Sequence, residues 1–132
     1  MKFFFDNCLS PNLARAIKLL DPKYDITHLR DKFPADVSDV EWINALASEG
    51  DWVIVSGDVR ITKNPQNRAA WRQSKLTAFF FDRQWTNQSL WDQAWRAVRW
   101  WPRIKSMAEG LPSGRGYVVP LNYGKLKPIA TD

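Results

Sequence analysis

The chain has 132 residues, which is the usual length of a single domain. Hydrophobic residues make up 45% and charged residues 25%, a balance typical of an ordinary globular protein with a core. The formal net charge of +5 favours an anionic partner. Nucleic acid is the usual partner of that kind, although many basic proteins bind none.

Cysteine content and the lengths of apolar runs limit the setting of the protein. Cys8 is the only cysteine, which excludes an intramolecular disulfide and makes a reducing cytoplasm the simplest expectation. The opening MKFFFD is not expected to act as a signal peptide, because its apolar run is too short. No apolar run approaches the length that crosses a bilayer, so no membrane contact is predicted.

Strands and helices are predicted to alternate along the chain. In chain order they are a strand at 2–6, a helix at 11–20, a weaker strand at 24–29, a helix at 39–48, a strand at 52–56, a helix at 65–74, a strand at 76–81, a helix from about 88 to 107 and a strand at 116–121. This alternation predicts a three-layer α/β/α fold with a central, mainly parallel sheet of four to five strands.

Capping and proline signals set several of these boundaries. Ser10 is expected to cap the first helix, and Ser38 with Glu41 forms a capping box for the second. Pro102 is expected to kink or end the fourth helix. Pro120 favours an edge position for the last strand.

One domain is expected over residues 1–132. It divides into a core at 1–85, a tryptophan-rich helical region at 86–109, and a C-terminal part at 110–132 with a loop, an edge strand and a polar tail.

Three apolar runs end on an aspartate, at Asp6, Asp58 and Asp82, and Asp39 opens a predicted helix. The carboxyl ends of parallel strands share one edge of a sheet, where ligands bind. Two carboxylates about 5 Å apart at an effective dielectric of about 20 repel by roughly 3 kcal/mol. Such a cluster needs a cation, a proton or a basic neighbour, and the sharpest hypothesis is a magnesium or manganese site. Asp82 is a possible additional acid of this site, although a turn residue is the simpler interpretation.

Two segments resemble the PIN-like nuclease superfamily. They are KFFFDNCLSPNLARAI, which looks like its opening strand, first acid and first helix, and SDVEWINALASEGDWVIVSGDVRI, which looks like its acid-led helix and Thr/Ser-x-Asp strand end. The resemblance covers roughly residues 1–85 and is closest to the short group that includes VapC-type toxins. It implies a PIN-like fold and metal-dependent endoribonuclease activity.

The resemblance also implies roles for particular residues. The family acids fall on Asp6, Asp39 and Asp58, which would hold Mg²⁺ or Mn²⁺, and Ser56 falls on the residue that helps to hold the site. Asn7 either orients a metal-bound water or makes a turn.

The chain departs from the family pattern at two places. Larger PIN domains carry another acid in a helical segment that is almost absent here, for which Asp31, Asp36 and Glu41 are the substitutes. Short relatives often carry a second acid two residues after the strand-end aspartate, where this chain has Arg60.

Basic residues follow the third strand. Arg60 and Lys63 are expected beyond the acidic edge, and Arg68 and Arg72 lie i, i+4 on one helical face. We predict that all of them contact the RNA backbone.

The chain has eight tryptophans, and their spacing predicts an interface. Trp42 and Trp52 are expected in the core. Trp100 and Trp101 are not expected to face one core together, so a surface of the fourth helix should be exposed or buried against a partner. His28 is expected to be a packed or surface residue, and Cys8 a small buried side chain.

The sequence therefore predicts an Mg²⁺- or Mn²⁺-dependent ribonuclease. The resemblance implies the toxin of a type II toxin–antitoxin pair, with an antitoxin partner; a homodimer is a further expectation. Two alternatives stay open. The first, which Arg60 favours, is a degenerate PIN-like protein that binds RNA without cleaving it. The second is an interaction module that assembles through its tryptophan-rich helix.

Overall fold

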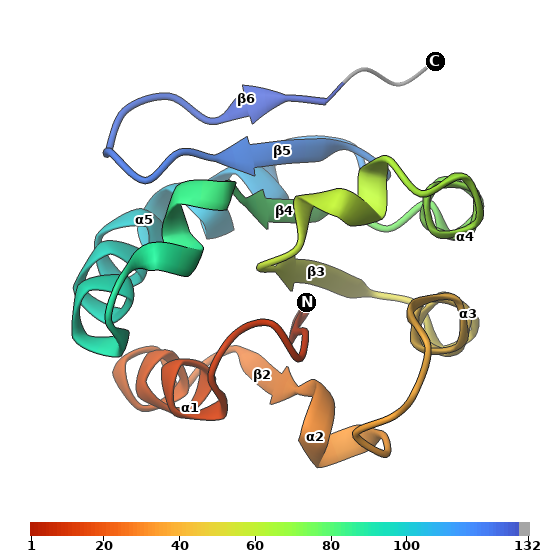
Figure 1. The fold of residues 1–132 in the computed structure, drawn as a ribbon, viewed down its shortest axis with the longest axis horizontal. Helices are drawn as coiled ribbons and strands as arrows, with labels where there is room; N and C mark the ends of the chain where they lie inside the picture. The colour runs from red at the N-terminus through yellow and green to blue at the C-terminus, as the bar shows by residue number, and fades with distance from the viewer. Residues whose placement is uncertain (130–132) are drawn as a thin grey trace.

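The computed structural model describes residues 1–129, and Figure 1 shows how its elements are arranged. Within these residues the α-helices are α1 (Pro11–Leu20), α2 (Leu29–Lys32), α3 (Asp39–Glu49), α4 (Pro65–Ser74) and α5 (Leu90–Gly110). The strands are β1 (Lys2–Phe5), β2 (Asp25–His28), β3 (Trp52–Ser56), β4 (Ala78–Phe81), β5 (Gly116–Val119) and β6 (Lys127–Pro128). Two 3-10 turns follow β3 and β4, namely η1 (Val59–Thr62) and η2 (Arg83–Asn87).

The strands form one sheet in the order β2-β1-β3-β4-β5-β6. All neighbours pair in parallel except β6, which is antiparallel to β5. The register places Phe5 of β1 between His28 of β2 and Val55 of β3. After β1 the chain forms β2 on one side of it and then crosses over to form β3 on its other side. The direction in which strands are added to the sheet therefore reverses between β1 and β3. Ligands of open α/β sheets bind at the carboxyl ends of such strands.

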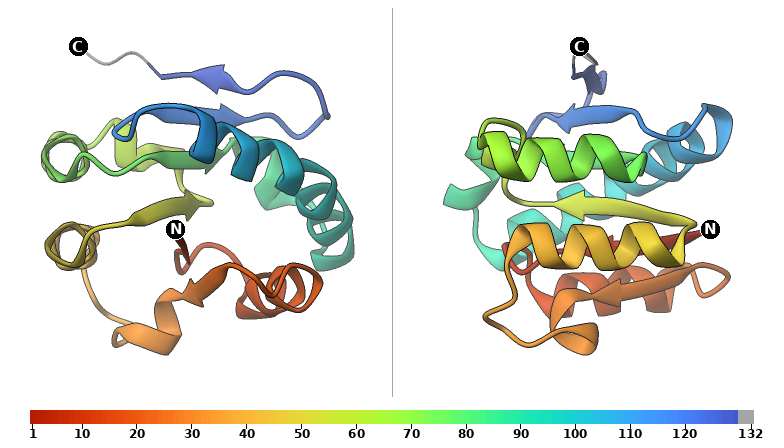
Figure 2. Two further views of the ribbon diagram at one scale, coloured as in Figure 1. Left: turned by 180° about the vertical axis from the view of Figure 1, so that it is seen from behind. Right: turned by 90° about the vertical axis from the view of Figure 1, so that its right-hand side faces the viewer.

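Helices cover both faces of the sheet, which confirms the three-layer α/β/α prediction. Figures 1 and 2 show α1 and α5 on one face and α3 and α4 on the other. Successive side chains of a strand point to opposite faces, so Phe3 and Phe5 enter the core under α1 and α5, whereas Phe4 enters the core under α3 and α4. Full burial of each ring contributes about 1.5–3 kcal/mol.

Helix boundaries follow the predicted capping signals. The side chain of Ser10 accepts a backbone N–H at the start of α1, and Ser38 and Glu41 form the reciprocal capping box of α3. Asn64 caps α4, and Gly50 ends α3 at φ 77°. These interactions are local, which is why the sequence pattern is sufficient to predict them.

The C-terminal part of the sheet differs from the prediction. The segment expected to be a polar tail contributes β6, so the sheet has six strands within the described residues, and β5 is an interior strand rather than an edge. Pro120 does not disturb this pairing, because β5 ends one residue before it. The rest of the predicted tail, residues 130–132, lies outside the described residues.

Helix α5 also differs from its prediction at both ends. Ser89 caps it, and the helix begins at Leu90 rather than at about residue 88; Thr86 and Asn87 lie in η2. The helix continues through Pro102 to its end at Gly110. Proline removes one helical N–H, and the carbonyl that loses this partner belongs to Val98, a residue that is 39% exposed. Neither α5 nor any other helix within residues 1–129 combines the length and apolarity that crossing a membrane requires.

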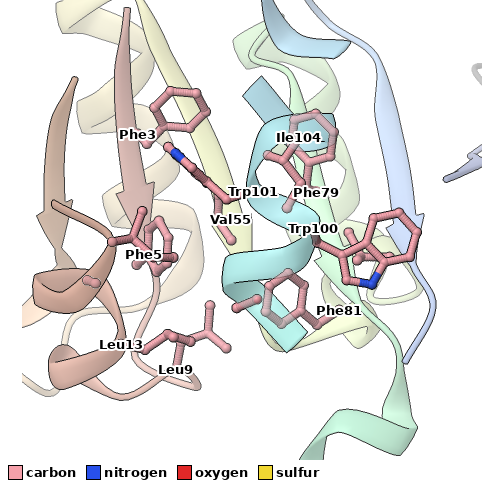
Figure 3. Close-up of a cluster of buried hydrophobic side chains, with 14 of the residues drawn as sticks. Phe3, Phe5, Leu9, Leu13, Val55, Phe79, Phe81, Trp100, Trp101 and Ile104 are labelled. Carbon is pink, nitrogen blue, oxygen red and sulfur yellow. The ribbon is translucent and has the colours of Figure 1, made fainter. Parts of the chain in front are cut away.

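The expectation that Trp100 and Trp101 cannot share one core is wrong. Both are buried in the cluster under α1 and α5, as Figure 3 shows. The ring of Trp100 packs near Tyr123, with centroids 4.9 Å apart, and Trp101 lies 4.6 Å from Phe3. Neighbouring side chains on a helix point about 100° apart, and the buried face of α5 is wide enough to hold both.

The other tryptophans agree with the prediction. Trp42 and Trp52 are core residues, whereas Trp91 is 84% and Trp95 50% exposed on α5. The tryptophan-rich helix therefore has an exposed surface, and its role as an interface stays a prediction.

Gly116 of β5 lies against the indole of Trp71, and its replacement by alanine should destabilise the fold. An added Cβ would lie 2.4 Å from Cη2 of Trp71. That ring is buried and its Nε1 donates to the carbonyl of Leu76 at 2.9 Å, so it is held in place. We expect Gly116→Ala to cost about 1–3 kcal/mol in urea unfolding. Trp71→Phe removes the clashing atoms, so in a double-mutant cycle it should recover part of that loss; strictly additive losses would contradict the clash.

Candidate active site

Asp6, the residue after β1, is the most buried acid of the predicted site, with 3% of its surface exposed. Its Oδ1 accepts backbone N–H groups from Cys8 at 3.0 Å and Gly57 at 3.3 Å, and its Oδ2 accepts the hydroxyl of Ser56. Burial raises the pKa of Asp6 to about 6, against the opposing effect of these hydrogen bonds. The charge of Asp39 raises this pKa further, so the two carboxylates lie close enough to interact.

Ser56 joins the ends of β1 and β3. It is fully buried, donates its hydroxyl to Asp6 and accepts the backbone N–H of Asp58 at 3.0 Å. Gly57 permits the close approach, because a Cβ there would lie 3.1 Å from the side chains of Cys8 and Leu9. The structure thus brings together Asp6, Ser56 and the backbone of Asp58 at the reversal point of the strand order, as the sequence predicts.

Asp58 is engaged with Arg60. Its Oδ1 accepts from the backbone N–H of Arg60 at 3.0 Å and from Nε at 2.8 Å, and its Oδ2 accepts from Nη2 at 3.2 Å. The side chain of Arg60 is 82% exposed, and that of Asp58 17%. Because the side chain of Arg60 is largely exposed, its pairing with Asp58 contributes little free energy and can be exchanged for another partner.

Asp39 lies at the first position of α3 and is held by two side chains. Its Oδ1 accepts the indole N–H of Trp42 at 2.9 Å, and its Oδ2 accepts the amide of Asn67 at 3.1 Å. Asn67 belongs to α4 and was not predicted as a site residue. No local pattern could have singled it out, because its position depends on how α4 packs beside α3.

Asp6, Asp39 and Asp58 do not form a preorganised metal site. Within residues 1–129, no group of three or more His, Cys, Asp or Glu side chains is arranged to hold a metal ion. The donor chemistry nevertheless fits Mg²⁺ or Mn²⁺, which prefer carboxylate oxygens, and Asp6 is a desolvated carboxylate that a bound cation would neutralise. An ion held by all three acids would compete with Arg60 for the carboxylate of Asp58.

The remaining candidate acids have local structural roles. Glu41 completes the capping box of α3, and Asp31 completes another for α2. Asp82 caps η2 by accepting the N–H of Gln84 at 2.9 Å, just as Asp58 caps η1. Asp36 is exposed in the loop before α3.

Asn7, Cys8 and His28 shape the loop that follows Asp6. Asn7 is exposed and accepts Nε of Arg30 at 2.8 Å. His28, expected to be either packed or at the surface, is buried with Nε2 2.6 Å from the carbonyl of Leu9, and burial lowers its pKa. Cys8 is exposed, which corrects the expectation of a buried side chain: it lies in the turn after β1 and lines a pocket there.

The predicted basic residues fall into two groups. Arg60 and Lys63 are exposed at the end of β3, beyond the acids. Arg68 donates to the carbonyl of Thr62 at 3.0 Å, and Arg72 lies 5.7 Å from the ring of Trp71, so both also contact their own chain. Their contact with RNA stays a prediction.

Comparison with known proteins identifies the fold family. A family model described as PIN like domain matches residues 1–83, more than half of the chain. Neither the curated proteins nor the solved structures contain a match to the chain. The matched residues include Asp39 at the start of α3, and Asp6 and Asp58 in the turns that follow β1 and β3. The chain belongs to the PIN-like domain family.

Proposed function

We propose that this protein is an endoribonuclease that hydrolyses phosphodiester bonds in RNA with the help of Mg²⁺ or Mn²⁺. The observation that carries the proposal is the buried carboxylate of Asp6 at the point where the strand order reverses, with a pKa raised to about 6. Strongly perturbed acids in such positions are typical of functional sites. PIN-like domains are commonly metal-dependent nucleases, and the resemblance to the family implies that Asp6, Asp39 and Asp58 are its acids.

Asp6, Asp39 and Asp58 would hold the ion. When bound, a divalent ion supplies an activated water and neutralises charge on the phosphate. Ser56 keeps the carboxylate of Asp6 oriented, and Asn67 does the same for Asp39. Arg60, released from Asp58, would be left beside the phosphates of the substrate.

The test is cleavage of a fluorescently labelled single-stranded RNA by the wild-type chain. We expect cleavage with Mn²⁺ or Mg²⁺ and none with EDTA. Mass spectrometry of the purified protein must exclude an inhibitory partner carried through purification. If the partner-free chain remained inactive with both ions, the nuclease proposal would be wrong.

A second candidate function is RNA binding without cleavage. The hydrogen-bonded pair of Asp58 and Arg60 favours it, because this pair already neutralises one of the three acids. The same preparation separates the two functions: salt-dependent RNA binding with no cleavage at any metal concentration would support this candidate.

The finer roles rest on the resemblance to VapC-type proteins alone. They are a toxin in a type II toxin–antitoxin pair and an antitoxin partner. A homodimer is a separate expectation drawn from the tryptophan-rich helix, and a reducing cytoplasm one drawn from the single cysteine. Co-expression with the protein encoded by a neighbouring small reading frame tests the toxin and antitoxin roles: a toxin should arrest growth alone and not with its partner.

A further inference from the structure

A pocket of about 470 Å³ lies between the turns that follow β3 and β4. We call it the η1–η2 pocket: Gly57, Asp58, Arg60 and Lys63 line it from the side of η1, and Arg83 and Thr86 from the side of η2. Its volume lies within the range of about 300–1,000 Å³ that is usual for small-ligand sites. A larger hollow of about 680 Å³ between the end of α5 and Leu126 is lined by none of the candidate acids.

The η1–η2 pocket adjoins the buried acid. Gly57 lines the pocket and donates its backbone N–H to Asp6. Asp58 lines it too, and it is one of the proposed metal ligands. A group bound in the pocket therefore lies next to the proposed reaction centre.

The pocket carries excess positive charge. Of its charged residues, Arg60 is paired with Asp58, whereas within residues 1–129 neither Lys63 nor Arg83 forms an ion pair. Lys63 and Arg83 are both exposed and line the pocket from two different turns, η1 and η2. A hollow with cations on two sides concentrates anions more strongly than a flat surface does.

The wall formed by η2 is firmly held. Trp85, in the middle of this turn, is buried, stacks on Phe81 with ring centroids 4.2 Å apart and donates its indole N–H to the carbonyl of Val119 at 3.0 Å. Thr86 donates its hydroxyl to the carbonyl of Arg83 at 2.8 Å. The backbone that carries Arg83 is thus fixed to the core, and binding there costs little ordering of the chain.

We propose that the η1–η2 pocket binds one nucleotide of single-stranded RNA by its phosphate, and that Arg83 is a substrate-binding residue. This inference rests on the proposed function, because it places the bound phosphate next to the cleaved bond. A guanidinium donates two hydrogen bonds to a phosphate, which suits Arg83 to this role. Single strands rather than duplexes fit, because only an unpaired strand can insert one nucleotide into a hollow.

The experiment measures binding in EDTA, where no cleavage occurs, by the anisotropy of a labelled single-stranded RNA at several salt concentrations. We expect Arg83→Ala to weaken binding several-fold and to reduce the salt slope by about 0.7, the value for one lost phosphate contact on a single strand. Arg83→Lys should restore the slope but only part of the affinity. Arg115→Ala is the matched control, since Arg115 is exposed at the opposite end of the strands, before β5.

Two results would overturn the inference. One is a salt slope for Arg83→Ala equal to those of wild type and Arg115→Ala; the other is equal binding to a duplex of the same sequence. Cleavage assays keep the two proposals apart. Mn²⁺-dependent cleavage with an unchanged KM in Arg83→Ala would contradict RNA binding by the pocket and support the nuclease proposal. RNA binding that depends on Arg83, in a chain that shows no cleavage, would support the pocket and contradict the nuclease proposal.

Discussion

Replacing Asp6 by asparagine is expected to reduce Mn²⁺-dependent RNA cleavage by at least about a hundredfold. Mutating a residue that only hydrogen-bonds a metal ligand already costs about 10–100-fold in metal affinity or activity, and Asp6 is proposed to bind the ion itself. Asparagine keeps an oxygen that can accept the N–H groups of Cys8 and Gly57, so the loop should retain its position. The negative charge that would hold the ion is lost. The measurement is the cleavage rate as a function of Mn²⁺ concentration.

The same substitution should stabilise the metal-free protein at neutral and alkaline pH. The pKa of Asp6 is about 6 in the folded chain, whereas the ordinary value of 3.8 applies to the unfolded chain. At pH values between these two, the native state binds more protons than the unfolded state. The contribution of Asp6 to stability therefore falls as pH rises through this window. The asparagine side chain of the variant does not titrate, and its advantage over aspartate should grow by roughly 2 kcal/mol from about pH 4 to about pH 8.

Asp25→Asn is the matched control for both measurements. Asp25 is an exposed aspartate at the first position of β2, at the opposite edge of the sheet. Because its side chain is exposed and lies away from the site, its replacement should leave cleavage unchanged and change the stability in urea little. Full activity in Asp6→Asn would show that Asp6 is not part of the active site. A pH-independent difference in stability between the variant and wild type would show that its carboxylate is not destabilised by burial.

The parts of the site that the sequence predicts are those set by local chemistry. Asp6 and Asp58 follow buried strands, and parallel strands must present their carboxyl ends at one edge. Asp39 follows the helix cap Ser38, so its place at the start of α3 is also fixed locally. The fold class follows from the same alternation of strands and helices.

The remaining parts depend on contacts between distant segments. Asn67 reaches Asp39 only because α4 lies beside α3, and Arg83 meets Lys63 only because β4 is the neighbour of β3. Arg60 stands out in the sequence as a departure from the family pattern, but its bonds to Asp58 require the tight turn η1. The exposed side chain of Cys8 likewise depends on the turn that Asp6 caps.

Trp101→Ala is expected to be among the most destabilising single changes in α5, with a loss of about 3–5 kcal/mol. The indole is 5% exposed, lies 4.6 Å from the ring of Phe3 and donates its N–H to Asp21 at 2.9 Å. Lys105 donates to the same carboxylate at 2.7 Å and lowers the pKa of Asp21. The indole thus joins α5 both to the sheet and to the end of α1.

Trp91→Ala on the same helix is the matched control. Trp91 is 84% exposed, so its removal should change stability by no more than about 0.5 kcal/mol. Trp101→Phe keeps the ring packing and loses only the hydrogen bond to Asp21, for an expected cost of about 1 kcal/mol. Circular dichroism during heating and in urea measures all three variants, and Trp101→Ala should melt roughly 10–20 °C below wild type. Equal losses for the two alanine variants would mean that α5 does not hold Trp101 inward, and the core under α1 and α5 would then be assembled differently.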